Sequence, residues 1–510
     1  MPRFKVVDYS PRFLPVDLSR QLLPGTFEYA LHHLLDHEID LSEIESRYCN
    51  DEVGASAYEP RILLKIVLLA YSHGIVSSRG MESACRNNVQ FIALSGDSQP
   101  DHSTLATFVS GLGEAVARVF TQVLMICQRQ GLIGREMFAI DGVKLPSNAS
   151  KAKSGKRKDF LRQAAKMEQA VHKLLNQHRD NDASAAADAQ LREREQRQIK
   201  RLTAEAQKIR DWLEQHPHER RSAKGKVRLS NRTDNESAKM ATGKGVVQGY
   251  TGVAAVDEKH QVIVEAQAHG TGSEHELLAP MADALKEVRG KDTAVCADSG
   301  YHSEENLKHL EAQGVEAFIP DPGYRERDPR YEGQEAHRGK PDPLWDKSPD
   351  KHGKAKLFRP QDFQVAEDFS SCTCPAGKRL YRNGTNCNIG GRRAVKFTSA
   401  QRDCENCPLR LQCLRHPQRS KVRQVAIFVG THAQSEETAT ERMKRKTDTD
   451  KGREMITRRF ATVEPVFGNI RNNKRMNRFT LRSQKKVDAQ WKLYCMVHNI
   501  EKLAHNGYAS

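Results

Sequence analysis

Two acidic residues, Asp141 and Asp298, each follow a short apolar run in this 510-residue chain. Residues 137–140 precede Asp141 in "MFAIDGVKL", and the apolar run of "TAVCADSGY" stops at Asp298. An acid at the carboxyl end of a core strand emerges where α/β sheets place their ligand crevices. We therefore expect both carboxylates at one site. The alternative for either residue alone is a simple turn, since Asp before Gly or Ser is common there.

The third candidate acid is Glu464 in "FATVEPVFGNIR". We expect it in the first turn of a helix capped by Thr462, with the carboxylate facing the same crevice. The alternative is that Glu464 only complements the helix dipole. Its neighbours in the sequence are basic, which suits contacts with DNA phosphates. These candidate DNA-binding residues are Arg458, Arg459, Arg471, Lys474, Arg475 and Arg478.

Two Asp and one Glu supply hard oxygen ligands, which suit Mg²⁺ or Mn²⁺. A pair of such ions about 4 Å apart activates a water or a 3′-hydroxyl and stabilises the leaving oxygen in phosphoryl transfer. We therefore expect Asp141, Asp298 and Glu464 to be both catalytic residues and ligands of two metal ions. The reaction would be DNA strand cleavage and joining.

Six of the 11 cysteines fall between Cys372 and Cys413. In a cytosolic chain, such clustering indicates a metal site rather than disulfides. A Cys-x-x-Cys pair with a third cysteine and a distant partner can close a tetrahedral thiolate site, which is typical of structural Zn²⁺. The expected zinc ligands are Cys374, Cys404, Cys407 and Cys413. Free thiols or a disulfide cluster are the alternatives.

The charge balance is strongly basic, with 81 Lys and Arg against 65 Asp and Glu, a net charge of +16. This favours a polyanionic partner, double-stranded DNA first, over an acidic small substrate; a plain basic protein is the alternative. The start of the chain lacks the apolar core of a secretory signal, and the longest apolar run, residues 62–70, is shorter than the roughly 20 residues that span a bilayer. We expect a cytoplasmic, nucleoid-associated protein with no membrane partner.

The order of apolar patterns predicts an α/β protein with a divided core. Apolar residues at spacings of three and four predict a helical hairpin after the first strand: Ile199, Leu202, Ala206, Ile209 and Leu213. "RDNDASAAADA" is its expected turn. We expect a helical N-terminal domain (1–134) that serves DNA-end binding or dimerisation. The core would comprise residues 135–150 and 233–320 and be completed by C-terminal helices (456–510). Two insertions would interrupt it, the helical hairpin (151–232) and a loop with a Cys-rich zinc segment (321–455).

Four blocks of this sequence, "AIDGVKLPSNASK", "YTGVAAVDEKHQVIVEAQ", "ADSGYHSEENL" and "VEPVFGNIR", resemble those of DDE transposases of the IS1182-like insertion-sequence family, within the IS5/IS4 type. The helical region near 45–125 and the cysteine segment are also similar to this group. The resemblance implies an RNase H-like core whose acidic triad is Asp141, Asp298 and Glu464. It also implies binding of terminal inverted repeats and Mg²⁺-dependent transposition, and we expect a homodimer or larger assembly on DNA.

The chain departs from the wider group beside Glu464. That group carries a Tyr and an Arg shortly before the Glu and a Lys seven residues after it, where this chain has Arg458, Arg459 and Phe460 before and Arg471 after. Arg471 keeps the charge but offers a planar fork instead of a point charge. We expect a transposase. The alternatives are a catalytically silent, zinc-containing DNA-binding protein derived from one, and an RNase H-like nuclease that cuts without joining.

Overall fold

The computed structural model describes residues 17–49, 56–182, 189–222, 225–243, 245–331, 357–389, 392–428 and 437–509. The chain divides into two compact units, residues 1–344 with 439–510, and residues 345–438. Most of the predicted hairpin turn (183–188) and half of the long exposed loop that the sequence predicts over about 321–370 (332–356) lie outside the described residues.

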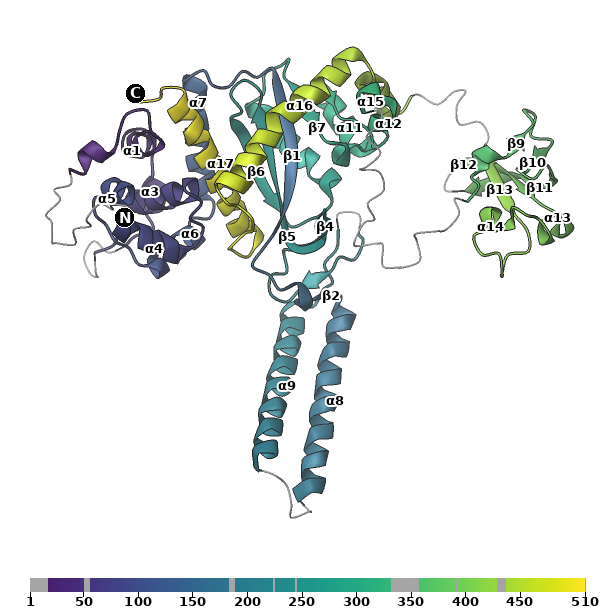
Figure 1. Ribbon diagram of the computed structural model, residues 1–510, viewed down its shortest axis with the longest axis horizontal. Helices are drawn as coiled ribbons and strands as arrows, with labels where there is room; N and C mark the ends of the chain where they lie inside the picture. Colours follow the sequence, from purple (N-terminus) through teal and green to yellow (C-terminus); the bar gives the residue numbers. More distant parts are fainter. Residues whose placement is uncertain are drawn as a thin grey trace, which may run out of the picture. The chain divides into compact units, whose positions relative to one another are not determined.

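A mixed sheet forms the centre of the first unit (Figure 1). Its order is β4-β5-β1-β7-β8, and β6 also pairs with β5. β1 runs antiparallel to β5 and parallel to β7, which in turn is parallel to β8. The strands are β1 (Met137–Pro146), β4 (Ala238–Thr242), β5 (Gly245–Asp257), β6 (Ile263–His269), β7 (Ala294–Ala297) and β8 (Ala317–Phe318).

Two C-terminal helices, α16 (Asp450–Gly468) and α17 (Gln484–His505), pack on this sheet. The indole of Trp491 is fully buried and donates a hydrogen bond to the carbonyl of Val253 on β5 at 2.9 Å. The neighbouring strand residue is Gly252, where an added Cβ would lie 2.9 Å from the indole. A glycine at this position therefore lets the helix approach the strand closely.

The runs "TAVCADSGY", "SEENLKHLEAQG" and "VEAFIP" predict a strand, a helix and a strand, and the structure has them as β7, α11 (Glu304–Ala312) and β8. The sequence "SEHELLAPMADALKEVRG" predicts one helix capped by Ser273 and ended by Gly290. In the structure this segment is instead divided into a 3-10 turn (Glu274–Glu276), α10 (Leu278–Ala284) and a second 3-10 turn (Leu285–Glu287). Pro280 explains the break, because it has no N–H to continue a helix that starts earlier but fits the first turn of α10.

The N-terminal part of this unit is helical and shares its core with α17. Tyr71 stacks on Tyr494 of α17 with ring centroids 4.2 Å apart. No single helix in the described part of the chain is long and apolar enough to span a membrane, and only the sharply bent α6–α7 pair passes by length and composition. The helices are α1 (Phe27–His37), α2 (Ser42–Glu45), α3 (Pro60–Ser72), α4 (Ser78–Asn87), α5 (Val89–Ser95), α6 (His102–Gly111) and α7 (Ala115–Arg129).

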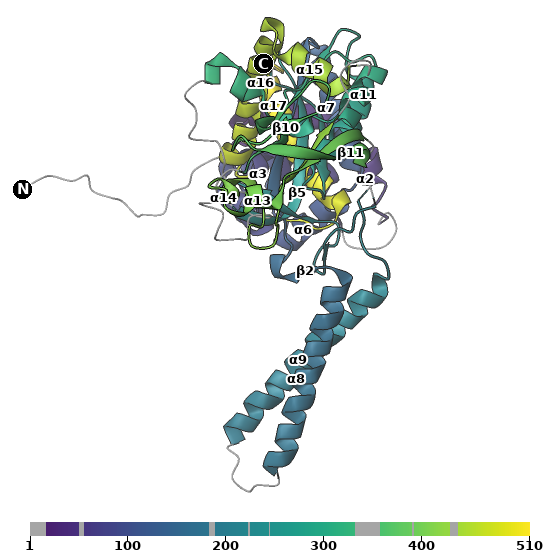
Figure 2. The ribbon, with the colours of Figure 1, turned by 90° about the vertical axis from the view of Figure 1, so that its right-hand side faces the viewer.

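The hairpin helices α8 (Arg157–Asp182) and α9 (Ala189–Gln215) lie side by side in Figures 1 and 2. Their small apolar core gathers near the base of the hairpin: Phe160, Ala164, Ile209 and Leu213. The base is closed by the short pairing of β2 (Ser154–Gly155) with β3 (Ser230–Asn231). Of the predicted seam, Ala206, Ile209 and Leu213 are buried, whereas Ile199 and Leu202 are only half-buried.

The second unit contains a five-stranded antiparallel sheet that the sequence did not lead us to expect, in the order β13-β12-β11-β10-β9. Its own small core includes Phe363, Leu380 and Phe397 together with the buried thiol of Cys372. The elements are β9 (Gln364–Val365), β10 (Cys372–Thr373), β11 (Arg379–Ile389), β12 (Arg392–Thr398), α13 (Gln401–Glu405), α14 (Arg410–Cys413) and β13 (Gln424–Phe428).

Candidate functional site

β1 and β7 bring Asp141 and Asp298 together. Ile140 lies opposite Ala297 in the last pair of the parallel ladder, and the next residue on each strand is the acid. Neighbouring strands lie about 4.8 Å apart. Both acids therefore stand at the same level of the sheet, where β7 ends and the chain turns into the 3-10 segment Ser299–Tyr301.

The expectation that the first strand ends at Asp141 is wrong. β1 continues to Pro146, because β5 pairs with it as far as Pro146 opposite Gly249. Asp141 therefore lies beside the end of the neighbouring strand β7, and not at the end of its own strand. Gly142 makes room on the same strand, since an added Cβ would lie 3.1 Å from the hydroxyl of Tyr301.

Glu464 lies near the end of α16, not in its first turn. Thr449 caps this helix by accepting a hydrogen bond from the Gly452 N–H at 3.1 Å, so the predicted cap at Thr462 is wrong. Pro465 sits inside the helix and cannot donate to the carbonyl of Ala461.

That free carbonyl of Ala461 accepts a hydrogen bond from the side chain of Gln261 at 3.2 Å. Gln261 belongs to the turn between β5 and β6. The bond that Pro465 removes from the helix is therefore replaced by one that ties α16 to the sheet, three residues before Glu464.

The three acids influence one another electrostatically. The pKa of Asp141 is raised to about 6, chiefly by burial. Arg459 and the Gly142 N–H oppose this rise, and the charges of Asp298 and Glu464 contribute to it. The structure therefore places both other carboxylates within electrostatic range of Asp141. Glu464 is exposed, and Asp298 is half-buried.

Arg459 forms an ion pair with Asp141. Its Nη2 lies 2.8 Å from Oδ2 of Asp141, and its side chain is only 3% exposed. Its guanidinium also lies over the ring of Phe460 at 5.2 Å. The neighbouring Arg458 instead donates to Glu258 through Nε at 2.7 Å.

The other basic candidates divide by exposure. Arg471, Arg475 and Arg478 are exposed. Lys474 is fully buried, and its ammonium lies 2.6 Å from Glu501. In this position Lys474 cannot reach a DNA phosphate, because its side chain is fully buried and paired with Glu501.

Carboxylates of this kind suit a hard divalent cation. Their present arrangement does not: among the described residues, no group of three or more His, Cys, Asp or Glu side chains is placed so that it could hold a metal ion. At Asp141, the ion pair with Arg459 takes the place that a metal contact would need.

Three family models match the chain. A transposase domain (DUF772) matches residues 16–111, and two transposase DDE domains match residues 216–365 and 373–504. Together these matches indicate a DDE transposase. No curated protein and no solved structure gave a significant match.

The mixed α/β architecture of the transposase is consistent with the RNase H-like fold of such domains. One DDE match contains Asp298 and the other contains Glu464, while Asp141 lies between matched segments. DDE transposase domains generally use divalent metals such as Mg²⁺.

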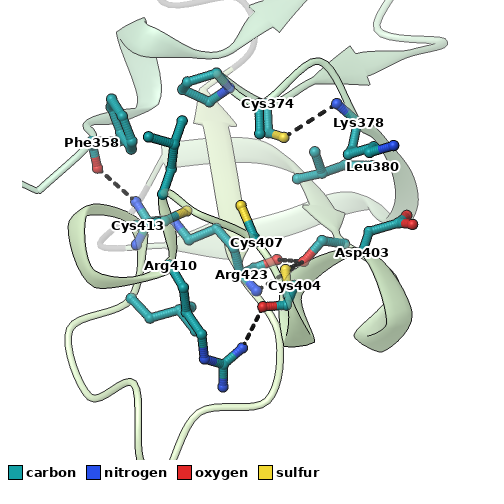
Figure 3. Close-up of a pocket in the computed structure, with 15 residues that line it drawn as sticks. Phe358, Cys374, Lys378, Leu380, Asp403, Cys404, Cys407, Arg410, Cys413 and Arg423 are labelled. Carbon is teal, nitrogen blue, oxygen red and sulfur yellow. Dashed lines mark hydrogen bonds between the residues drawn. The ribbon is translucent and has the colours of Figure 1, made fainter.

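A second group of reactive side chains lies in the second unit of the transposase. The four cysteines expected as zinc ligands, Cys374, Cys404, Cys407 and Cys413, line one small cavity of about 30 Å³. Figure 3 shows their sulfur atoms around one space. Cys372 instead packs into the core of that unit, and Cys387 does not line the cavity.

The thiols already have polar neighbours. Sγ of Cys374 accepts a hydrogen bond from the Lys378 N–H at 3.4 Å, and Ser399 Oγ lies 2.9 Å from Sγ of Cys404. Burial raises the pKa of Cys413, the nearby charge of Arg423 lowers it, and the other three sulfurs raise it. All four cysteines therefore lie within electrostatic range of one another.

Tyr301 is a site residue that sequence reasoning missed. It is 1% exposed, and its hydroxyl has no hydrogen-bond partner among the described residues. The signal was its place in "ADSGY", three residues after Asp298.

Asp298 also lines a cavity of about 330 Å³. Arg325 of α12 (Tyr324–Arg327) lies over the rings of Tyr331 and Phe460 in its wall. Only the fold brings these residues together, since they are separated by more than a hundred positions from Phe460.

Proposed function

We propose that this transposase, of the IS1182-like family within the IS5/IS4 type, binds the terminal inverted repeats of an insertion sequence and catalyses metal-dependent DNA cleavage and strand transfer. Asp141, Asp298 and Glu464 are the proposed catalytic residues. The observation that supports this best is the β1–β7 register, which sets two of the acids side by side at the end of a ladder. The influence of Glu464 on the pKa of Asp141 adds the third.

The proposed cofactor is a pair of Mg²⁺ or Mn²⁺ ions, with the three carboxylates as protein ligands. When bound, such ions activate the attacking hydroxyl and stabilise the leaving oxygen. The contribution of the chain is to hold two acids on a rigid sheet and the third on a helix anchored to that sheet through Gln261.

The proposed DNA contacts are made by the exposed arginines after Glu464, namely Arg471, Arg475 and Arg478. Arginine suits phosphate because its planar fork donates two parallel hydrogen bonds. We further propose that the N-terminal helices serve DNA-end binding or dimerisation, that the active assembly is a homodimer or larger, and that the protein works in the cytoplasm on the nucleoid.

We also propose a structural Zn²⁺ ion bound by Cys374, Cys404, Cys407 and Cys413. The convergence of the four thiols on one cavity supports this. As placed, the thiols do not form a group that could hold a metal ion. Zinc binding would therefore draw together the segment after β10, which carries Cys374, and the α13–α14 region, which carries the other three cysteines.

The test of the catalytic assignment is a strand-transfer assay with DNA that carries the element's ends. Asp141→Asn, Asp298→Asn and Glu464→Gln should each abolish cleavage and joining, because each removes one carboxylate charge, while DNA binding should stay nearly intact. Glu454→Gln is a matched control on the exposed side of the same helix, and it should remain active.

Full activity in any of the three acid variants would refute the assignment of that residue. The same assay separates the alternatives: cleavage without joined product would favour a nuclease, and binding without cleavage by the unaltered chain would favour a silent DNA-binding protein.

A further inference from the structure

Asp141 already has a cationic partner in the structure. Arg459 contacts one carboxylate oxygen of Asp141 at 2.8 Å, and the backbone N–H of Gly142 donates to the other at 2.7 Å. Both oxygens of the carboxylate are thus engaged. The guanidinium comes from α16, the helix that also carries Glu464.

Two buried hydrogen-bond donors beside this ion pair have no partner among the described residues. Nε of Arg459 is buried and has no hydrogen-bond partner among the described residues, and the same is true of the hydroxyl of Tyr301. Tyr301 faces Asp141 closely enough for the two to influence each other electrostatically. Buried donors without partners cost free energy, so the arrangement around Asp141 leaves hydrogen-bonding capacity that a ligand could use.

The adjacent arginine shows that this pairing is specific to one side chain. Arg458 lies next to Arg459 in the helix, but it pairs with Glu258 and lies 3.5 Å from Glu136. Its side chain is 34% exposed, against 3% for Arg459. One arginine therefore serves the surface and the other serves Asp141.

We propose that Arg459 is an internal counter-ion of Asp141, which a divalent metal ion must displace. This rests on the proposed function, in which Asp141 is a metal ligand. A guanidinium and a divalent cation repel each other and compete for the same carboxylate oxygens. Arg459 therefore weakens metal binding by the DNA-free transposase and keeps the charge of its site balanced until the metal binds.

The test measures the affinity of the full-length protein for Mn²⁺ in the absence of DNA. The concentration of free Mn²⁺ is detected by electron paramagnetic resonance. Arg459→Gln and Arg459→Met should each bind Mn²⁺ about tenfold more tightly than the unaltered chain, because one charge-assisted hydrogen bond to Asp141 no longer has to be broken. Arg459→Lys, which keeps the charge, should bind within a few-fold of the unaltered chain. The matched control is Arg458→Gln, whose affinity should not change.

Unchanged or weaker Mn²⁺ binding in Arg459→Gln and Arg459→Met would overturn the proposal, because Arg459 would then be a group that positions Asp141 for the metal. If these variants fail to fold, side-chain NMR of the unaltered protein labelled with ¹⁵N-arginine decides: Mg²⁺ should shift the Nε–H signal of Arg459, assigned by its loss in Arg459→Lys. An unshifted signal at saturating Mg²⁺ would also overturn it.

Failure of the proposed function looks different. If Asp141→Asn, Asp298→Asn and Glu464→Gln all bind Mn²⁺ like the unaltered chain, the acids are not metal ligands. If they lose binding while Arg459→Gln binds as the unaltered chain does, only the role of Arg459 is wrong.

Discussion

The ion-pair partner of a single basic residue in this chain cannot be deduced from its neighbours in the sequence. Arg459 and Lys474 both belong to the basic stretch around Glu464, yet one is held by Asp141 and the other by Glu501. A run of basic residues near a catalytic acid favours DNA contacts on chemical grounds. Whether a particular cation is free for phosphate depends on which acid the fold places beside it, and the sequence does not contain that information locally.

His498 gives a prediction at this scale. It is buried on α17, where Nε2 lies 2.9 Å from the carbonyl of Gln261. Burial lowers the pKa of His498 to about 3, from 6.5 for an ordinary histidine. Below pH 6.5 the unfolded chain therefore takes up a proton that the folded chain refuses, so stability falls as the pH falls toward 3. The loss is about 1.4 kcal/mol per pH unit, and above pH 6.5 this residue adds no pH dependence.

The substitution His498→Gln removes the imidazole that takes up this proton in the unfolded chain. The free energy of unfolding, measured by urea at pH 7.5 and at pH 5.5, should therefore fall less with acid in this variant than in the unaltered chain, even if it starts lower. Equal slopes in the two proteins would show that His498 is protonated in the folded state as readily as in the unfolded state.

At the scale of secondary-structure elements, the hydrophobic pattern predicted whether a segment is a helix or a strand, but it did not predict where each element begins and ends. The apolar runs of β1 and β7 and the pattern of α9 follow from the sequence, because buried strands and packed helices need those side chains. The start of α16 does not, since Pro465 looks like a residue of a first turn and is in fact tolerated near the helix end by the side chain of Gln261. A tertiary contact decides that boundary.

The contact of α17 with β5 gives the prediction at this scale. Gly252→Ala should destabilise the protein by about 1–3 kcal/mol, because the new methyl group would lie 2.9 Å from the buried indole of Trp491 and force one of the two elements to shift. Urea unfolding at pH 7.5 measures the change.

Gly468→Ala is the control. It lies at the end of α16, where an added Cβ meets nothing within 4 Å, and alanine is the better helix former. This variant should be as stable as the unaltered chain or slightly more so. Equal losses in both variants would mean that the close approach of Trp491 is not what Gly252 provides.

At the scale of the whole molecule, the chain carries its acids and its cysteines in different units. The acids fall in residues 1–344 and 439–510, and the four cavity cysteines fall in 345–438. Chemical reasoning from the sequence selected both sets, because residue type and spacing carry that signal. It did not reveal the sheet of the second unit, because β9 and β10 are only two residues long and the longer β11 buries only Leu380, so none of these strands shows an alternating apolar pattern.

This separation makes the zinc proposal testable without the catalytic site. The purified full-length protein should contain about one equivalent of zinc, and Cys407→Ser should lose it, because a four-thiolate site binds weakly with one ligand missing. Cys387→Ser, outside the cavity, should retain it. Zinc well below one equivalent in the unaltered protein, or retained in Cys407→Ser, would count against the four-cysteine site.

The ladder between β1 and β7 constrains how this protein could change. Side chains alternate between the two faces of a strand, so a shift of β7 by one residue would turn Asp298 to the opposite face while leaving the sheet itself able to form. The turn at Gly290–Thr293 before β7 is partly exposed, a position where a deletion is ordinarily harmless. Here its length sets which face of the sheet carries Asp298, a proposed catalytic residue, so the turn should tolerate substitution far better than insertion or deletion.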